Sequence, residues 1–305
     1  MAVEFAGLRL NNPIIAASGT FGYGLEFAPL LDLEKLGGLV VKGLSRLPMA
    51  GNPPPRLVET PAGLLNSIGL QNIGVAAFVQ KKLPLLAQVR TAVIANVFGY
   101  QTEDYVEVVR QLESAPGLAA YELNLSCPNT RHGGIVFGSD PVLTKQVTEA
   151  VRKICRRPLI VKLSPNVTDI ATFAQAAEAG GADAVSLVNT FVGMQLGRGP
   201  DQATLPGGTG GLSGPAIRNV ALRLVHQAVR AVRIPVIGMG GIVCGADAAE
   251  FLRAGAVAVE VGTASFYDPL ATVRIVGELE SFCRRAGIGS IADLSPLHPH
   301  GGGQG

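Results

Sequence analysis

Short apolar runs recur along the chain, and each of them ends in small or polar residues. Eight runs are suited to a buried strand: 13–17, 39–41, 93–97, 121–125, 159–163, 184–188, 235–239 and 257–261. Near-continuous apolar strands, as opposed to alternating ones, are typical of a parallel sheet that is covered on both faces. The pattern therefore predicts a set of parallel strands.

Stretches with apolar residues at helical spacing lie between most of these runs. They cover 26–36, 75–90, 103–113, 141–154, 170–179, 216–232, 246–254 and 269–284. Strands that alternate with helices in this number favour a closed α/β (β/α)8 TIM barrel. An open doubly wound sheet is the alternative, but no G-x-G-x-x-G follows the first strand, which weakens it.

The remaining segments fit around this barrel. Residues 3–10 alternate around Gly7 and predict a short hairpin. The insertions 44–72 and 191–214 follow strand ends, so both should stand over the C-terminal face of the barrel. We expect one barrel domain over 1–296 and a disordered tail over 297–305, which is rich in His, Pro and Gly.

Composition narrows the class of protein. The chain has 305 residues, of which 48% are hydrophobic and 16% are charged, with a formal net charge of +2. This balance implies no polyanionic partner such as nucleic acid. No apolar run is long enough to span a bilayer, and no signal peptide pattern opens the chain. The sequence thus predicts a cytoplasmic protein.

The cysteines give no metal-binding pattern. Cys127, Cys155, Cys244 and Cys283 are far apart and form no C-x-x-C pair. This spacing argues against a zinc or iron–sulfur site within the chain and fits a reducing compartment. We therefore predict no metal ligands.

Residues 121–134 carry the most distinctive chemistry. The first half is typical of a buried strand, and Pro128 cannot continue a sheet interior. Cys127 lies at this strand end between two carboxamides, Asn124 and Asn129. A lone Cys is usually a small buried apolar residue, but amides in a loop are poor core material unless they bind something. The stretch therefore predicts a site that holds a polar planar ligand beside a proton acceptor.

Other strand ends are polar as well, whereas the strand bodies are predicted to be apolar. These ends contribute Ser18, Lys42, Gly43, Asn96, Asn124, Lys162, Ser164, Asn189 and Thr190. Chemistry in a barrel sits at the C-terminal ends of its strands. One lysine at such a place could be a solvated strand end. Two lysines and three asparagines around one mouth suit a ligand with negative charge and many hydrogen-bond acceptors.

The last two strand ends are rich in glycine. They read Gly240-Gly241 and Gly262-Thr263, and Gly214 precedes the helix expected from 216. Free backbone N–H groups at this position form phosphate sites, although many barrels use such glycines only as tight turns. A phosphate here and lysines in the centre suggest flavin mononucleotide (FMN), whose reduced ring a nearby lysine would stabilise.

The first insertion ends in Asn66-Ser67-Ile68-Gly69-Leu70-Gln71-Asn72. This segment is either an ordinary capped turn before the helix from 75 or a binding loop. As a loop, it would offer an amide and backbone N–H groups to a substrate carboxylate.

These motifs together resemble the dihydroorotate dehydrogenases, specifically the catalytic subunit of class 1B. The matching pieces are 17–19, 41–43, 66–72, 124–129, 161–163, 188–190, 240–241 and 262–263, in order and over nearly the whole chain. The Asn-Leu-Ser-Cys-Pro-Asn motif is specific, and 133–140 resembles the class 1B lid. Class 2 enzymes instead use a Ser base and carry an N-terminal membrane helix.

The resemblance implies an activity and a set of partners. Cys127 would be the catalytic base in the oxidation of (S)-dihydroorotate to orotate, a step of de novo pyrimidine biosynthesis, with hydride transfer to FMN. Electrons would pass to NAD through a partner subunit that carries FAD and a 2Fe–2S cluster. A homodimer of this chain would form the core of a heterotetramer with that subunit.

The resemblance also assigns residues to each ligand. Substrate would contact Lys42, Asn66, Ser67, Ile68, Gly69, Leu70, Asn124, Asn189 and Thr190. FMN would contact Ser18, Lys42, Gly43, Asn96, Asn124, Lys162, Val188, Gly214, Gly240, Gly241, Gly262 and Thr263.

Several other functions are compatible with parts of the pattern. A fumarate-using class 1A dihydroorotate dehydrogenase is one of them, and the distinction from it rests on the lid sequence. A dihydropyrimidine dehydrogenase or a dihydrouridine synthase would keep the flavin and change the substrate. The lack of a basic RNA-binding extension disfavours the dihydrouridine synthase. A non-redox isomerase or synthase that binds a sugar phosphate would explain the glycines and lysines, but not the Asn-x-x-Cys-x-Asn arrangement.

Overall fold

The computed structural model describes residues 1–125, 137–197 and 204–294. Cys127, Asn129 and the first part of the predicted lid lie outside these ranges, as do residue 296, where the domain is predicted to end, and the predicted tail.

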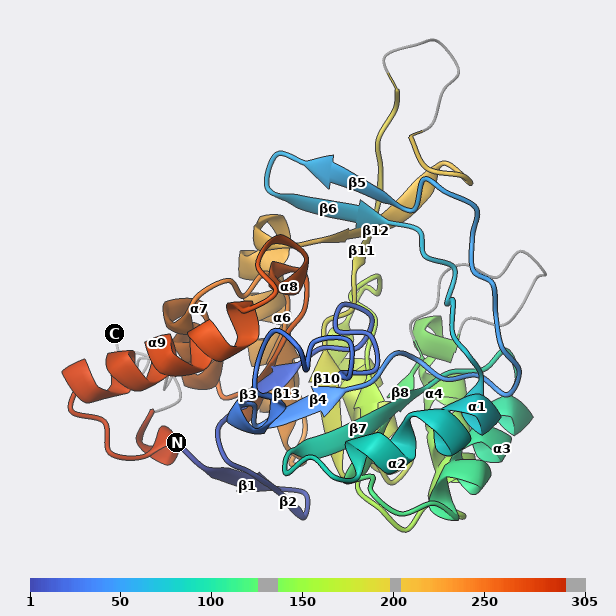
Figure 1. The fold of residues 1–305 in the computed structure, drawn as a ribbon, viewed down its shortest axis with the longest axis horizontal. Helices are drawn as coiled ribbons and strands as arrows, with labels where there is room; N and C mark the ends of the chain where they lie inside the picture. Colours follow the sequence, from blue (N-terminus) through green and yellow to red (C-terminus); the bar gives the residue numbers. More distant parts are fainter. Residues whose placement is uncertain (126–136, 198–203, 295–305) are drawn as a thin grey trace, which may run out of the picture.

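Eight parallel strands close into a barrel (Figure 1). They are β3 (Ile14–Ala16), β4 (Gly38–Val40), β7 (Ala92–Val97), β8 (Ala120–Asn124), β9 (Leu159–Lys162), β10 (Ala184–Leu187), β13 (Val236–Met239) and β14 (Ala258–Val261). Neighbours in this order are hydrogen-bonded, and β14 closes the ring on β3. The predicted TIM barrel is confirmed, with every strand within two residues of its expected bounds.

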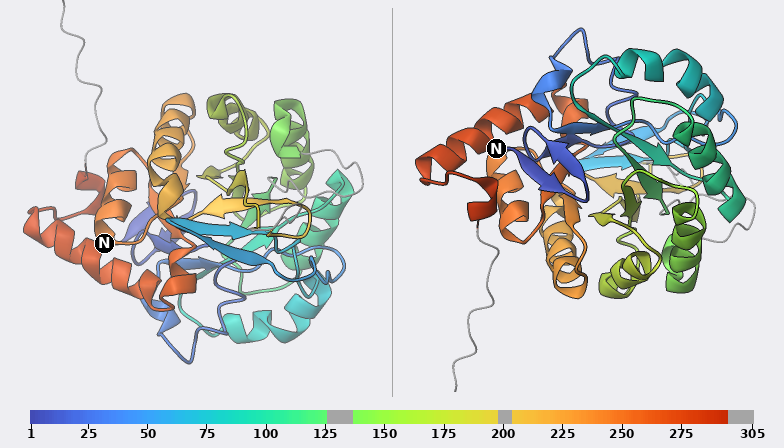
Figure 2. Two further views of the ribbon diagram at one scale, coloured as in Figure 1. Left: turned by 90° about the horizontal axis from the view of Figure 1, so that it is seen from above. Right: turned by 90° about the horizontal axis from the view of Figure 1, so that it is seen from below.

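Helices form a ring outside the strands (Figure 2). The ring contains α1 (Val75–Lys81), α2 (Leu83–Leu86), α3 (Thr102–Glu113), α4 (Pro141–Arg152), α5 (Ile170–Ala179), α6 (Arg218–Ala231), α7 (Gly245–Arg253) and α9 (Ala271–Arg285). Short elements are α8 (Ala264–Tyr267) and the 3-10 turns η1 (Leu33–Lys35), η2 (Phe137–Ser139), η3 (Pro215–Ile217) and η4 (Ile291–Asp293).

One predicted helix is wrong and another is interrupted. Residues 26–36 form turns that end in η1, because Pro29 lacks a backbone N–H and the Glu26 carboxylate accepts a bond from the Tyr23 N–H instead. The predicted helix 75–90 divides at Lys82, where Pro84 occupies the first turn of α2.

The bottom of the barrel is filled by apolar side chains. Every strand contributes one residue to this floor: Ile15, Val40, Ile94, Ala120, Ile160, Ala184, Ile237 and Ala258. The predicted hairpin is present as β1 (Val3–Phe5) and β2 (Leu8–Leu10), and its Phe5, Leu8 and Leu10 pack against the floor from below. The hairpin thus closes the N-terminal end of the barrel.

A layer of polar side chains lies directly above this floor. Successive side chains of a strand point to opposite faces, so a residue two positions beyond a floor residue also faces the interior. Five of these eight positions hold buried polar residues: Asn96, Glu122, Lys162, Ser186 and Glu260. The interior therefore changes from apolar to polar within one layer.

A second sheet covers the C-terminal mouth (Figure 1). The insertion 44–72 supplies β5 (Leu57–Thr60) and β6 (Gly63–Asn66), and the insertion 191–214 supplies β11 (Phe191–Met194) and β12 (Thr209–Ser213). Antiparallel pairing of β12 with β6 joins the two insertions into one four-stranded cover sheet. Their expected position over the mouth is confirmed.

No helix in the three described ranges has the length and apolar character that a membrane crossing needs.

Candidate functional site

A cavity of about 390 Å³ lies between the barrel mouth and the cover sheet. Its walls include nearly all of the residues predicted from the sequence: Ser18, Lys42, Gly43, Asn66, Ile68, Gly69, Leu70, Asn96, Asn124, Lys162, Val188, Asn189, Thr190, Gly214, Gly240, Gly241, Gly262 and Thr263. The fold therefore gathers them around one space, although which ligand each residue contacts stays a prediction.

Ser67 does not line the cavity. It is buried beneath the loop, where its Oγ accepts a hydrogen bond of 2.8 Å from Asn52 Nδ2. The Asn52 N–H also donates to the Ile68 carbonyl at 3.0 Å. Arg56 adds contacts to the Gln71 side chain and the Ala50 carbonyl. These bonds hold 66–71 in place, so Ser67 acts on the loop's shape in this structure.

One end of the cavity is built from glycine turns. Gly240 and Gly241 follow β13 with φ of 127° and 72°, a range that L side chains rarely adopt. A Cβ on Gly241 would lie 2.8 Å from both Arg218 Cβ and the Gly214 carbonyl oxygen. Gly262 and Thr263 follow β14 and lead into the short helix α8. Backbone packed this closely is suited to a phosphate.

Asp247 fixes the shape of this turn. It lies in the first turn of α7 and is buried, and its Oδ2 accepts hydrogen bonds from the Val243 and Cys244 N–H groups at 2.9 and 3.1 Å. Its Oδ1 forms an ion pair with Arg218 at the start of α6. Two helices thereby clamp the loop after β13.

The opposite end carries carboxamides. Asn189 Nδ2 donates to Asn124 Oδ1 at 3.4 Å, and the Thr190 N–H donates to Asn189 Oδ1 at 2.8 Å. Asn66 Nδ2 donates to the Gly211 carbonyl at 3.0 Å, which ties β6 to β12. The amides of barrel and cover sheet thus face the same space.

Lys42 brings a cation to the mouth. Its backbone N–H donates to the Gly22 carbonyl at 2.8 Å, just after β4. Burial of the side chain lowers the pKa of Lys42, and the neighbouring Arg56 lowers this pKa further. The amine would therefore gain from an anionic ligand.

Two glutamates inside the strands are candidate functional residues that the sequence did not reveal. Strand bodies were predicted to be apolar, and this is wrong at Glu122 and Glu260. Lys162 Nζ lies 3.5 Å from Glu122 Oε1 and 3.5 Å from Glu260 Oε2. Each glutamate stands alone within an apolar run, and that isolated charge was the available signal.

Glu122 is fully paired. Asn96 Nδ2 donates to its Oε1 at 2.6 Å, and Ser186 Oγ donates to its Oε2 at 2.7 Å. Burial by itself would raise the pKa of Glu122, but Lys162 and these hydrogen bonds lower it below its ordinary value. Burial likewise opposes the charge of Lys162, yet the two carboxyl groups raise its pKa.

Two buried acceptors of this polar layer have no hydrogen-bond partner among the described residues: Asn96 Oδ1 and Glu260 Oε1. A Cβ on Gly43 would lie 2.8 Å from Asn96 Oδ1, so that oxygen faces the cavity wall at Gly43. Within the described ranges no group of three metal-ligating side chains occurs. The site thus offers donors, acceptors and cations to an organic ligand.

Fold and site together define a (β/α)8 barrel whose mouth offers cations, amides and backbone turns suited to an anionic organic ligand. The family model for dihydroorotate dehydrogenase matches residues 1–283. The chain belongs to the dihydroorotate dehydrogenase family of oxidoreductases, which confirms the resemblance and disfavours a non-redox barrel.

The relatives carry two different names. A protein of Solibacter usitatus named putative dihydroorotate dehydrogenase A (fumarate) is 61% identical over 294 residues, which are 96% of this chain and 97% of that protein. The dihydroorotate dehydrogenase B (NAD(+)) catalytic subunit of Trichlorobacter lovleyi is 54% identical with the same coverage of both chains.

A solved structure confirms the fold. The crystal structure of DHODH from Eimeria tenella in complex with ferulenol superposes with a TM-score of 0.82 at 22% identity, over 97% of this chain and 88% of that chain. At this sequence identity, the structural similarity supports the barrel fold alone.

Proposed function

We propose that the chain is the catalytic subunit of a class 1B dihydroorotate dehydrogenase, which oxidises (S)-dihydroorotate to orotate in pyrimidine biosynthesis. The observation that carries the proposal is the single cavity that collects the asparagines, lysines and glycine turns, in a chain of this family. Dihydroorotate has a carboxylate and a ring with several N–H and C=O groups, and the cavity offers partners for each.

The cavity also fits FMN. Gly214, Gly240 and Gly241 bring bare backbone to the cavity wall in turns too tightly packed for a Cβ, and backbone of this kind suits a phosphate. Asn96 Oδ1 is a buried acceptor that a ring N–H could satisfy. Lys162 supplies a cation at the cavity wall. When bound, FMN would supply the two-electron acceptor for the substrate.

The residues of the chain would divide the remaining work. Asn66, Asn124, Asn189 and Thr190 would orient the substrate by hydrogen bonds. The entropy cost of placing the reacting carbon atoms would then be met on binding and not in the chemical step. Lys42 would bind negative charge at the mouth. The cover sheet would keep bulk water away, which strengthens these interactions.

Cys127 would be the general base that takes a proton from C5 of dihydroorotate. This assignment comes from the sequence, because Cys127 lies outside the described residues. Cys127→Ser should keep bound flavin but slow its reduction by dihydroorotate about 10²–10⁴-fold, since a hydroxyl is far less acidic than a thiol. Stopped-flow reduction across a pH range measures this, and unchanged rates at every pH would contradict the assignment.

The acceptor is the second part of the proposal. The relative from Trichlorobacter lovleyi is named for NAD and called a catalytic subunit, and the lid sequence 133–140 points to the same class. Electrons would then leave through a partner subunit with FAD and a 2Fe–2S cluster. The relative from Solibacter usitatus makes fumarate the specific alternative.

Anaerobic addition of dihydroorotate to the purified, FMN-loaded chain tests the core of the proposal. The oxidised flavin absorbance should bleach, and orotate should appear in equal amount. If the chain binds FMN but the flavin stays oxidised after dihydroorotate is added, the substrate would instead be another dihydropyrimidine. A chain that takes up no FMN at all would favour a non-redox barrel.

A further inference from the structure

We propose that Glu260 is a positioning residue that carries a proton and holds Lys162 beneath the cavity, so that Glu122, Lys162 and Glu260 together have no net charge. The inference rests on the proposed function only for the identity of the ligand above the cluster. Its evidence lies in the contacts within the barrel.

The three side chains converge from separate strands in the barrel interior. Glu122 comes from β8, Lys162 from β9 and Glu260 from β14. Side-chain exposure is 0% for Glu122, 6% for Lys162 and 1% for Glu260, so water screens none of the charges. Two carboxylates and one ammonium in such a place would leave an uncompensated buried negative charge, which is costly.

The hydrogen bonds show which of the two carboxyl groups carries the proton. Glu260 Oε2 lies 3.5 Å from Lys162 Nζ, but Glu260 Oε1 is buried and has no hydrogen-bond partner among the described residues. A buried carboxylate is costly when its oxygens lack such partners, and protonation removes that charge. Glu122 already accepts bonds from Asn96 and Ser186 and lies beside Lys162, which stabilises its ionised form. The proton therefore belongs to Glu260.

The surroundings of Glu260 support this assignment. Its neighbours in the sheet are Met239 on β13 and Ile15 on β3, and neither carries charge. Within the described residues, Glu122 and Lys162 are the charged groups that act on it. Burial raises the pKa of Glu260 well above its ordinary value, Glu122 raises it further, and Lys162 only partly opposes this.

The neutral cluster has a consequence for the ligand. Lys162 and Glu260 both line the cavity. A fully ionised cluster would place excess negative charge below a reduced, anionic flavin ring and disfavour reduction. With Glu260 protonated, Glu122 balances Lys162, and Glu260 keeps the ammonium between the two carboxyl groups instead of letting it move toward Glu122.

Glu260→Gln separates charge from position. The glutamine oxygen can accept from Lys162, as Glu260 Oε2 does, and the NH₂ group is uncharged like the OH of a protonated acid. Flavin midpoint potential and its pH dependence should therefore match those of the wild type. Glu260→Ala removes the support of Lys162 and should weaken FMN binding about tenfold, the effect of losing one hydrogen bond to a charged group. An upward shift of the potential in Glu260→Gln would mean that an anion had been removed and would overturn the proposal.

Infrared spectroscopy gives a readout that needs no turnover. The full chain, with glutamate labelled by ¹³C and with or without FMN, should show the C=O band of a protonated carboxylic acid at neutral pH. The band should vanish in Glu260→Gln and persist in Glu250→Gln, an exposed control on α7. A wild-type spectrum without the band would contradict the proposal even if the variants failed to fold. Failure of dihydroorotate to bleach the flavin would instead count against the proposed function alone.

Discussion

At the scale of single residues, the mouth of the barrel contains buried and partly buried groups whose charge depends on their neighbours. Lys42 is one such group, because burial and the nearby Arg56 both lower the pKa of its amine. The sign of the effect follows directly: Lys42 loses its proton at a lower pH than an ordinary lysine, and an anionic ligand would restore that proton.

Orotate affinity should therefore fall as pH rises through the lowered pKa of Lys42, before ordinary lysines titrate. Lys42→Met should bind orotate about tenfold more weakly at neutral pH, with most of this pH dependence removed. Titration of the FMN-loaded chain with orotate, followed by flavin absorbance across alkaline pH, measures both effects. Lys145→Met, an exposed control on α4, should follow the wild type. A Lys42→Met curve parallel to that of the wild type would contradict the role of Lys42.

The residues that the sequence revealed and those that it hid differ in one respect. Lys42 and Asn189 follow apolar runs, and Asn124 lies near the end of one, so the ends of strands pointed to them. Glu122 and Glu260 lie deeper inside such runs and are far apart in the chain. Only closure of the barrel, which brings β8 and β14 to opposite sides of Lys162, explains how these charges are tolerated.

At the scale of elements, the shape of the cavity depends on the tight turn at Gly241, which follows β13. Gly241→Ala should weaken FMN binding about tenfold or more, because the added Cβ would lie 2.8 Å from Arg218 Cβ at a φ of 72°. Gly277→Ala is the matched control: nothing lies within 4 Å of its Cβ, and alanine stabilises a helix such as α9 by about 0.5–1 kcal/mol. Equilibrium dialysis with FMN compares the two. Equal affinities would show that the turn does not touch the ligand.

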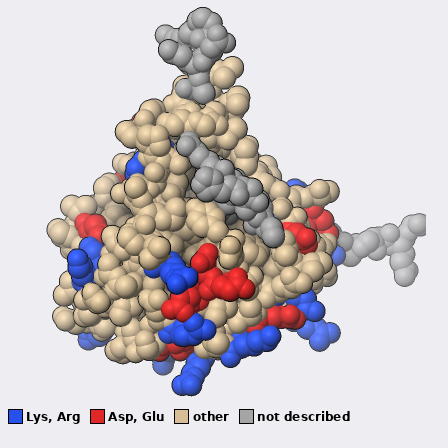
Figure 3. Space-filling model, turned by 90° about the vertical axis from the view of Figure 1, so that its right-hand side faces the viewer, with Lys and Arg blue, Asp and Glu red and all other residues tan. Residues whose placement is uncertain are grey.

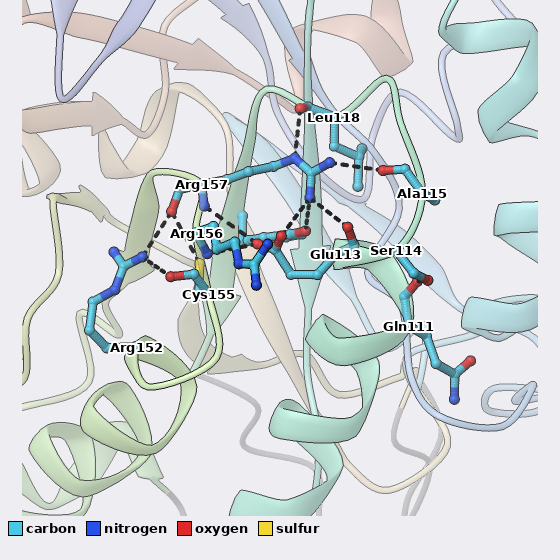
Figure 4. A network of polar contacts seen from close by, with 10 residues as sticks. Gln111, Glu113, Ser114, Ala115, Leu118, Arg152, Cys155, Arg156 and Arg157 are labelled. Atoms are coloured by element: carbon cyan, nitrogen blue, oxygen red, sulfur yellow. Dashed lines mark hydrogen bonds and ion pairs between the residues drawn. The ribbon is translucent and has the colours of Figure 1, made fainter.

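The outer ring has its own polar anchor, away from the cavity (Figure 4). Arg157, just before β9, donates to the Leu118 and Ala115 carbonyls at 3.1 and 2.8 Å. It also donates to the Tyr121 hydroxyl at 2.8 Å and forms an ion pair with Glu113 at 3.0 Å. One side chain therefore ties the end of α3 to β8 and β9.

Arg157→Met should lower the free energy of unfolding by about 1–3 kcal/mol, because partly buried acceptors lose their donor. Arg110→Met breaks an exposed ion pair with Glu107 and should change the free energy of unfolding by less than about 0.5 kcal/mol. Urea unfolding followed by circular dichroism measures both. Flavin reduction should be unaffected in either variant. An Arg157→Met protein with the free energy of unfolding of the wild type would show that these contacts do not stabilise the fold.

Element prediction succeeded where period and length agreed. Apolar spacing predicts a helix over 170–179, and α5 has these bounds. In the structure Asp169 caps the first turn and Gly180 follows the last residue. The segment 26–36 has apolar residues at similar spacing but contains Pro29, and its Phe27 stacks on Phe21 at 3.9 Å between ring centroids. Tertiary packing and the missing N–H outweighed the periodicity there.

At the scale of the whole molecule, the cover sheet offers a surface for a partner. Its edge strand β11 and the residues just after it expose Val192, Met194 and Leu196 at 52%, 58% and 69%. Val192 also lines the cavity, so a partner bound here would come close to the ligands. On the face shown in Figure 3, charged side chains gather over the lower part, and the upper part is mainly uncharged. If the proposed electron-transfer subunit binds this chain, these features favour docking at the cover sheet.

We expect the chain alone, supplied with dihydroorotate, to reduce NAD slowly and to gain this activity when the iron–sulfur subunit is added. Met194→Glu should weaken that association about tenfold or more, as charges in a buried interface core do. Val142→Glu, at an equally exposed position on α4, should not. Steady-state NAD reduction against subunit concentration measures this. Fast fumarate reduction by the chain alone would move it to class 1A.

The closed bottom of the barrel dictates an order of arrival and departure. Since the floor and the hairpin close the lower end, ligands come and go through the mouth alone in the part of the chain that the structure describes. The molecule bound deepest must enter first and leave last. If that molecule is FMN, orotate bound beneath the cover sheet would block its exit through the mouth. Product would then slow the loss of the coenzyme, and a resting enzyme in a cell rich in orotate would keep its flavin longer than an empty one.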